Sequence, residues 1–101
     1  MRVLVFFDLP TKTVADRRAY RHFRKFLLTN GFIMLQESVY SKLTTSRTTG
    51  ETIKNNVRDA APKSGNIMLC DMTEEQYARI AYLNGQPDSE YITSTERIII
   101  I

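Results

Sequence analysis

Apolar positions along the chain recur with two different periods. Four short runs are rich in β-branched and aromatic residues and are separated by turn signals or polar stretches: residues 2–7, 32–35, 38–43 and 67–70. Runs of this kind predict strands. The segments 13–29 and 48–60 instead place apolar residues three and four positions apart, which predicts helices. The order is strand, helix, strand, strand, helix, strand, so the sequence predicts an α+β fold of the ferredoxin-like βαββαβ type.

Capping signals indicate where the helices begin. Thr13 followed by Asp16 predicts a capping box at the start of the first helix. Thr48 followed by Glu51 predicts the start of the second helix. Thr73 opens a further short helix after the fourth strand. The short helix lies outside the βαββαβ pattern and is expected to belong to an appendix of the core.

Length and the terminal sequence indicate the domain organisation. A chain of 101 residues fits a single domain. Its core is expected in residues 1–72, and residues 73–101 are expected to form a C-terminal extension for dimer and partner contacts. The extension ends in isoleucines, of which Ile98, Ile99 and Ile100 predict an additional strand. Because an exposed apolar edge promotes aggregation, this strand is expected to pair with a sheet edge, either in a second copy or in its own domain.

Both faces of the first predicted strand are apolar. Val3, Val5 and Phe7 point to one side, and Leu4 and Phe6 point to the other. A strand with one solvent-exposed face would alternate apolar with polar residues. The two predicted helices can cover only one face of the sheet. We therefore expect a homodimer packed through the sheets about a two-fold axis, with Leu4 and Phe6 in the interface.

Basic residues are concentrated in the first predicted helix and in the loop before it. Six of the fourteen Lys and Arg residues lie there, with a single acid among them: Lys12, Arg17, Arg18, Arg21, Arg24 and Lys25. We call these six residues the basic ridge. Its arginines lie opposite an apolar side of the helix that includes Phe23 and Leu27. Such a row favours sequence-independent binding to a nucleic-acid backbone, although an ordinary solvated helix face is the alternative.

The net charge of +3 conceals an uneven distribution. Residues 1–63 carry twelve basic and five acidic residues, whereas residues 64–101 carry two basic and six acidic residues. This asymmetry indicates two different partners, or one partner bound at one end, unless the acids only increase solubility. Four more cations are expected to extend the basic surface: Lys42, Arg47, Lys54 and Arg58. Only Tyr20 and Tyr40 are candidates for exposed stacking, so a duplex is favoured over single strands.

Asp8 is the one convincing candidate for chemistry. It ends the first strand on the side of Leu4 and Phe6, so a two-fold axis there would bring it close to its copy. Two facing carboxylates share a proton or hold a hard cation such as Mg²⁺. The alternative is a turn-capping role, because an Asp before a Leu-Pro turn commonly bonds the following backbone.

The sequence has no motif for a disulfide, a zinc site, a phosphate-binding loop or a catalytic nucleophile. His22 is the only histidine and is expected on a helix flank, and Cys70 is the only cysteine. An internal disulfide and a zinc-ligand set are therefore excluded, and a reducing cytoplasmic location is expected. No apolar segment approaches membrane-spanning length, so no membrane partner is expected. No Gly-rich phosphate loop or nucleophile elbow is present.

Several short motifs, taken in order, resemble the CRISPR-associated protein 2 family. The motifs are Val-Phe-Phe-Asp-Leu-Pro at 5–10, Arg-Lys-Phe-Leu at 24–27, Asn-Gly-Phe at 30–32, Gln-Glu-Ser-Val-Tyr at 36–40 and Arg-Ile-Ile-Ile at 97–100. The resemblance is greatest to members found beside type II effector systems. It implies a ferredoxin-like homodimer that bridges two integrase dimers and holds the prespacer duplex during CRISPR spacer acquisition.

The resemblance also bears on Asp8 and on the acidic end of the chain. Asp8 matches the family's strand-end aspartate, which implies Mg²⁺ binding and a metal-dependent endonuclease activity on single-stranded RNA or double-stranded DNA. The acidic last third is expected to dock the integrase. Two hypotheses therefore stay open: an architectural DNA-binding bridge, and an endonuclease that uses Asp8 across the dimer.

Overall fold

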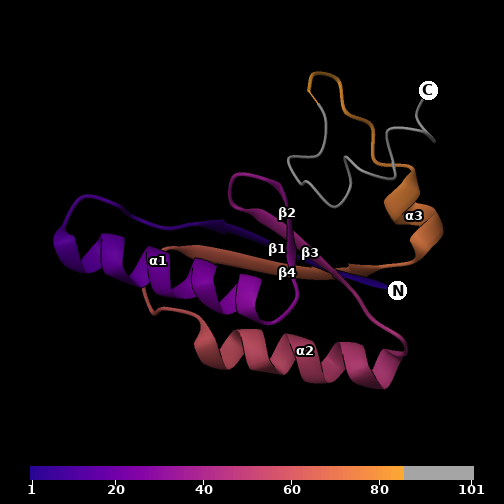
Figure 1. Cartoon of the computed structure of the whole chain (residues 1–101), viewed down its shortest axis with the longest axis horizontal. Coiled ribbons are helices and arrows are strands. Elements are labelled where there is room, and N and C mark those ends of the chain that lie inside the picture. The colour runs from indigo at the N-terminus through magenta and orange to yellow at the C-terminus, as the bar shows by residue number, and fades with distance from the viewer. Residues whose placement is uncertain (86–101) are drawn as a thin grey trace.

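Four antiparallel strands form one sheet in the computed structural model, which describes residues 1–85 (Figure 1). The strand order across the sheet is β2-β3-β1-β4, so β1 and β4 are neighbours although they are far apart in sequence. The strands have the following bounds: β1 (Arg2–Asp8), β2 (Ile33–Gln36), β3 (Val39–Leu43) and β4 (Asn66–Met72). With α1 (Val14–Thr29) and α2 (Arg47–Ala60) as crossovers, this order confirms the predicted ferredoxin-like α+β fold.

The predicted capping box at the start of α1 is confirmed. The Asp16 N–H donates to the Thr13 hydroxyl at 3.0 Å, and the Thr13 N–H donates to the Asp16 carboxylate at 3.2 Å. The predicted start of α2 is wrong by a few residues. Ser46 caps α2 and accepts a hydrogen bond from the Thr49 N–H at 3.1 Å. Ser46, not Thr48, is the N-cap residue: Ser46 has the extended backbone conformation of a cap, and Thr48 already lies within the helix.

The main core lies between the sheet and the two long helices, which lie on the same side of it (Figure 1). Phe23 and Leu27 of α1 are buried, and each such burial contributes about 1.5–3 kcal/mol. Phe7 of β1 lies at the centre, with its ring 5.2 Å from that of Phe23 and 5.6 Å from that of Tyr40. Val3 and Val5 share this face and are fully buried, as their alternation predicts.

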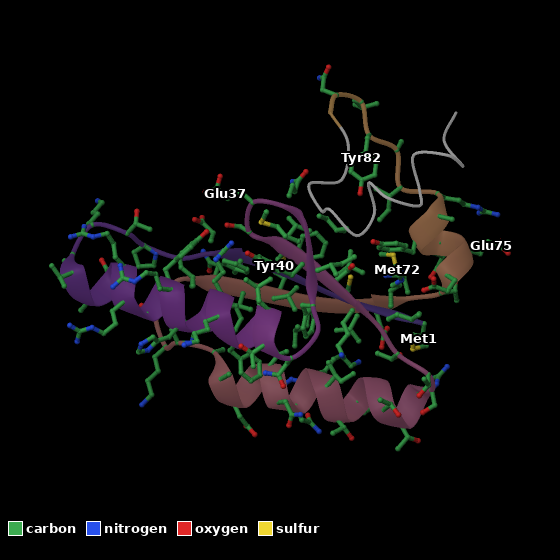
Figure 2. The ribbon with its side chains drawn as sticks, in the orientation of Figure 1. Met1, Glu37, Tyr40, Met72, Glu75 and Tyr82 are labelled. Carbon is green, nitrogen blue, oxygen red and sulfur yellow. The ribbon has the colours of Figure 1, made fainter. Side chains whose placement is uncertain are left out.

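The two tyrosines considered as candidates for exposed stacking belong to this core instead. Tyr40 is 1% exposed, and Tyr20 packs edge-on against Phe7 with the ring centres 5.8 Å apart. Tyr40 is paired with Val5 in the sheet register, which places both side chains on the helix side. Figure 2 shows Tyr40 inside the molecule. Burial raises the pKa of the Tyr40 hydroxyl, and the nearby positive charge of Arg24 opposes that rise.

The second face of the sheet is partly covered by the chain itself, which corrects the expectation that no helix would reach it. The short helix α3 (Glu74–Ala78) follows β4, and Tyr77 and Ile80 pack with Leu4. The Arg2 guanidinium secures α3, since it donates to Glu74 at 2.9 Å and lies 4.2 Å from the centre of the Tyr77 ring. Leu4 is only 2% exposed, so it has no free surface for a partner.

What remains open on that face lies toward the other end of β1. Phe6 is only partly buried, and its register partner Met68 is 64% exposed. The predicted terminal strand, with Ile98, Ile99 and Ile100, lies outside the described residues. Among residues 1–85, no helix is long and apolar enough to cross a membrane.

Candidate functional site

The basic ridge occupies the outer face of α1 and the loop before it. All six of its side chains are exposed, because the buried face of α1 is taken by Phe23 and Leu27. Figure 2 shows nitrogen-tipped side chains projecting from the surface of α1 that faces away from the sheet. The 16 residues of α1 extend over about 24 Å. The prediction that these cations lie on the exposed side of the helix, opposite Phe23 and Leu27, is therefore confirmed.

The ridge cations have no acidic partner among the salt bridges of residues 1–85. Asp16, the one acid in this stretch, directs its carboxylate to the Thr13 N–H in the capping box. Arg17 is held by the chain instead, because its Nη1 donates to the carbonyl oxygens of Thr11 and Lys12 at 3.1 Å each. The charge of the ridge is consequently available to an external anion, and a polyphosphate backbone matches a row of cations of this length.

One of the four further cations, Lys54, does not extend this surface as a free charge. Lys54 on α2 donates to Asp71 at 2.8 Å and forms an ion pair with Glu51 at 2.7 Å. These contacts raise the pKa of the Lys54 ammonium and lower the pKa of the Asp71 carboxyl. Arg58 donates to Asn55 at 2.6 Å within the same helix. Lys54 is therefore the one of these four cations that has acidic partners among the salt bridges of residues 1–85.

The acidic residues of α3 lie at the other end of the molecule. Figure 2 shows Glu75 there, far along the long axis from the start of α1. Glu75 pairs with Arg79 at 2.9 Å, and Glu74 pairs with Arg2. The acids of α3 are thus paired with arginines at the end of the molecule away from the start of the basic ridge.

Asp8 is the last residue of β1, and its side chain is exposed. Strand alternation places it on the face of Phe6, away from the two long helices. It borders a shallow pocket whose other walls are Phe6, Phe7, Ser38, Val39, Asn66 and Met68. The loop 9–13 joins the end of β1 directly to α1, so only this short loop separates Asp8 in the chain from the start of α1.

The alternative role of Asp8 as a turn cap has no support in the geometry. Among the side-chain hydrogen bonds of residues 1–85, none involves the Asp8 carboxylate. Leu9 is buried. The turn that follows it is held instead by Arg17, whose guanidinium donates to the carbonyl oxygens of Thr11 and Lys12. The Asp8 carboxylate is therefore left available for a ligand.

The donor set around Asp8 fits a hydrated cation bound together with a substrate. Within residues 1–85 no group of three or more His, Cys, Asp or Glu side chains gathers as a metal site. Mg²⁺ commonly uses one or two protein carboxylates and completes its octahedron with water and phosphate oxygens. One exposed carboxylate with neighbouring Asn and Ser oxygens is compatible with that mode, in which Asp8 would hold the ion and the ion would polarise a phosphate.

Sequence reasoning missed the two polar neighbours of Asp8. Ser38, expected to start the third strand, lies instead in the β2–β3 turn with a positive φ of 67°. Its turn position was suggested by the adjacent Gln36-Glu37, but β-strand pattern alone does not fix a boundary to one residue. Asn66 faces Asp8 across β1 and β4. That pairing depends on the register of two strands far apart in sequence, for which the sequence carries no local signal.

Comparison with known proteins gives a consistent result. Residues 1–80 match the family described as CRISPR associated protein Cas2. The chain is 46% identical over 101 residues to the CRISPR-associated endoribonuclease Cas2 of Streptococcus mutans, covering 100% of this chain and 93% of that protein. It is 41% identical over 101 residues to the protein of the same name from Treponema denticola, with 100% of both chains covered.

A solved structure supports the same assignment. The crystal structure of Streptococcus pyogenes Cas2 at pH 6.5 superimposes with a TM-score of 0.63 and 26% sequence identity, covering 83% of this chain and 100% of that chain. Similarity in sequence and in fold therefore agrees over the part of the chain that carries the ridge and Asp8.

Proposed function

This chain belongs to the CRISPR-associated protein Cas2 family, and from that premise we propose that it acts as an architectural bridge in spacer acquisition. In this role a homodimer holds the prespacer duplex by sequence-independent contacts to its backbone, between two integrase dimers. The observation that carries the proposal is the row of exposed ridge cations on α1 that have no acidic partner within residues 1–85.

The geometry favours a duplex over a single strand. Stacking on single-stranded bases requires exposed aromatic rings beside the cations, but Tyr40 is buried and Tyr20 packs on Phe7. A straight helix of about 24 Å can follow several phosphates of a duplex. If four ridge residues per protomer each neutralise one phosphate, a dimer makes eight contacts. The salt dependence of binding would then have a slope of about −7 in log K against log [salt].

The bridge is tested by neutralising the ridge without disturbing the fold. Arg18, Arg21 and Lys25 are suited to this, because they are exposed and, unlike Arg17, hold no loop carbonyl. Changing the three to Gln should weaken binding of a duplex of about 30 base pairs by at least about hundredfold in fluorescence anisotropy. A control removes two cations outside the ridge by changing Lys63 and Arg79 to Gln, and it should retain the affinity. Equal affinity in the two variants would refute the bridge.

Dimer formation is proposed through the open part of the sheet face around Phe6 and Met68. Both are apolar and incompletely covered by the chain, and the two-fold operation would place one Asp8 near the other. Ile98–Ile100 are proposed to pair with a sheet edge of the partner, and the acidic residues after residue 63 are proposed to contact the integrase. Light scattering on Phe6→Ser and on a chain lacking residues 97–101 tests the two interfaces separately, and an unchanged dimer in either case removes that interface.

A second function, Mg²⁺-dependent endonuclease activity, is favoured by one specific observation. Asp8 presents an exposed carboxylate that makes no side-chain hydrogen bond within residues 1–85. The relatives from S. mutans and T. denticola are named endoribonucleases. Asp8→Asn keeps the shape and removes the charge, so it should abolish Mg²⁺-dependent cleavage of RNA while leaving duplex binding and spacer integration intact. Retained cleavage in this variant would remove Asp8 from the nuclease site, and a native chain that shows no Mg²⁺-dependent cleavage would remove the nuclease role itself.

A further inference from the structure

We infer that Asn66 is a second binding residue of the Asp8 site, whose side-chain amide oxygen ligates the same divalent cation. This inference rests on the proposed metal role of Asp8. Asn66 is the first residue of β4 and lies more than fifty positions after Asp8 in the chain.

The sheet register brings the two side chains together. β1 and β4 pair in antiparallel register, with Asp8 opposite Asn66 and Phe6 opposite Met68. Directly opposed residues of antiparallel strands project to the same face, with Cβ atoms about 4.5–5.5 Å apart. Asp8 and Asn66 both border the shallow pocket beside Phe6 and Met68. The two functional groups therefore occupy one site on the face away from α1 and α2.

Backbone features on both sides hold this pair in place. Gly65 has a φ of +85°, and a Cβ there would lie 2.8 Å from the Asp8 carbonyl oxygen, so only glycine permits this close approach of β4 to the end of β1. On the other side, Ser38 is the one non-glycine residue of the described chain with a positive φ. Its carbonyl accepts a hydrogen bond from the Phe7 N–H at 3.1 Å. The end of β1 is thus fixed between two tight turns.

The Asn66 side chain has no structural use that would compete with binding. It is exposed, and no side-chain hydrogen bond involves it within the described part of the chain. Asn66 directly follows the turn at Gly65, a place where asparagine is common, so what distinguishes it as a ligand is its position opposite Asp8.

The chemistry of the pair suits a hard cation. Carboxylate and amide oxygens are both ligands that Mg²⁺ and Mn²⁺ accept at about 2.1 Å, and adjacent ligands of an octahedron lie about 3 Å apart. Two opposed side chains of this length can bring their oxygens to that separation. The remaining positions are open to water, to the phosphate oxygens of a nucleic acid and, in the proposed homodimer, to the partner subunit's Asp8.

The test measures Mn²⁺ binding to the nucleic-acid-free protein by paramagnetic broadening of its amide NMR signals. Mn²⁺ should broaden the signals of Asp8, Asn66 and Ser38 first. Asn66→Ala should weaken Mn²⁺ binding about fivefold or more, and Asn66→Asp should restore or strengthen it because a second carboxylate adds charge. Asn56→Ala, an exposed amide on α2, is the matched control and should leave the affinity unchanged. A circular dichroism melt of each variant verifies that the fold is retained.

The outcomes separate this inference from the proposed function on which it rests. If Asp8→Asn removes Mn²⁺ binding and Asn66→Ala does not change it, the role of Asn66 is refuted and the metal role of Asp8 stands. If Asp8→Asn leaves Mn²⁺ binding unchanged, both are refuted. Weakened binding in both variants, with recovery in Asn66→Asp, supports both.

Discussion

Helices α1 and α2 cover the same face of the sheet, yet their cations have different partners. Lys54 of α2 is shared between Glu51 and Asp71, whereas within residues 1–85 Arg58 donates only to the neutral amide of Asn55. The ridge of α1 meets no acid within residues 1–85, because its one local carboxylate is used in the capping box. The number of basic residues on a helix therefore says less about binding than the acids that lie within reach of them.

The largest expected effect concerns the anchors that hold each helix on the sheet. Phe23 of α1 and Val57 of α2 are each 1% exposed. Phe23→Ala should lower the free energy of unfolding by about 3–5 kcal/mol, and Val57→Ala by about 2 kcal/mol, since a larger side chain leaves a larger cavity. Urea denaturation followed by circular dichroism measures both. A smaller loss for Phe23→Ala than for Val57→Ala would contradict the position of the Phe23 ring at the centre of the main core.

The next effect compares one outward arginine on each helix. Arg21→Glu on α1 should weaken duplex binding about fiftyfold at 0.1 M salt, because a dimer loses two phosphate contacts. Arg58→Glu on α2 should change the affinity by less than about threefold, since Arg58 lies outside the basic ridge. Fluorescence anisotropy with one labelled duplex measures both. Comparable losses for the two variants would show that α2 belongs to the binding surface.

A smaller effect is expected from a substitution in α2 that changes the free energy of unfolding and leaves duplex binding unchanged. Gly50 is buried inside α2, and a Cβ there would meet its nearest neighbour, the Thr44 hydroxyl, at an ordinary contact distance of 3.6 Å. Gly50→Ala should therefore raise the free energy of unfolding by about 0.5–1 kcal/mol, because alanine restricts the unfolded chain and favours the helix. Duplex affinity should stay the same. A destabilised variant would mean that the space around Gly50 is tighter than this distance indicates.

The smallest effect is the pH dependence of the Lys54–Asp71 pair. The hydrogen bond from Lys54 lowers the pKa of Asp71 below its ordinary value of 3.8 and raises the pKa of Lys54 above 10.5. The carboxyl therefore stabilises the fold above about pH 4, and this contribution is lost as the pH falls through its lowered pKa. The ammonium contributes below its ordinary pKa and loses its contribution as the pH rises through the raised one. Lys54→Met should accordingly be less stable than the native chain at pH 7, and the difference should shrink below about pH 4. A constant difference would exclude this pair as its source.

The sequence predicted those features that depend on local pattern. Alternation along residues 2–7 placed Val3 and Phe7 in the main core, and helical spacing placed the ridge opposite Phe23. Thr13 and Asp16 located the start of α1 because a capping box is a contact between residues three positions apart.

Features that depend on contacts between distant segments could not be predicted in this way. Leu4 was assigned to a dimer interface, but α3 folds back and covers it with Tyr77. Tyr40 was a candidate for exposure, but its pairing with Val5 places its side chain in the core. Asn66 faces Asp8 only because the register of β1 and β4 sets them opposite each other. Each of these outcomes follows from tertiary geometry, which hydrophobic period and composition do not encode locally.

The most direct test of the central claim is the salt dependence of duplex binding. Affinities of the native chain and of the Arg18, Arg21 and Lys25 to Gln variant are measured by anisotropy from 50 to 300 mM salt. The native dimer should give a slope of about −7, and the variant should be shallower by about 5, since six phosphate contacts are lost. Parallel slopes for the two proteins would contradict the account, because the cations of α1 would then not be those that meet the phosphates.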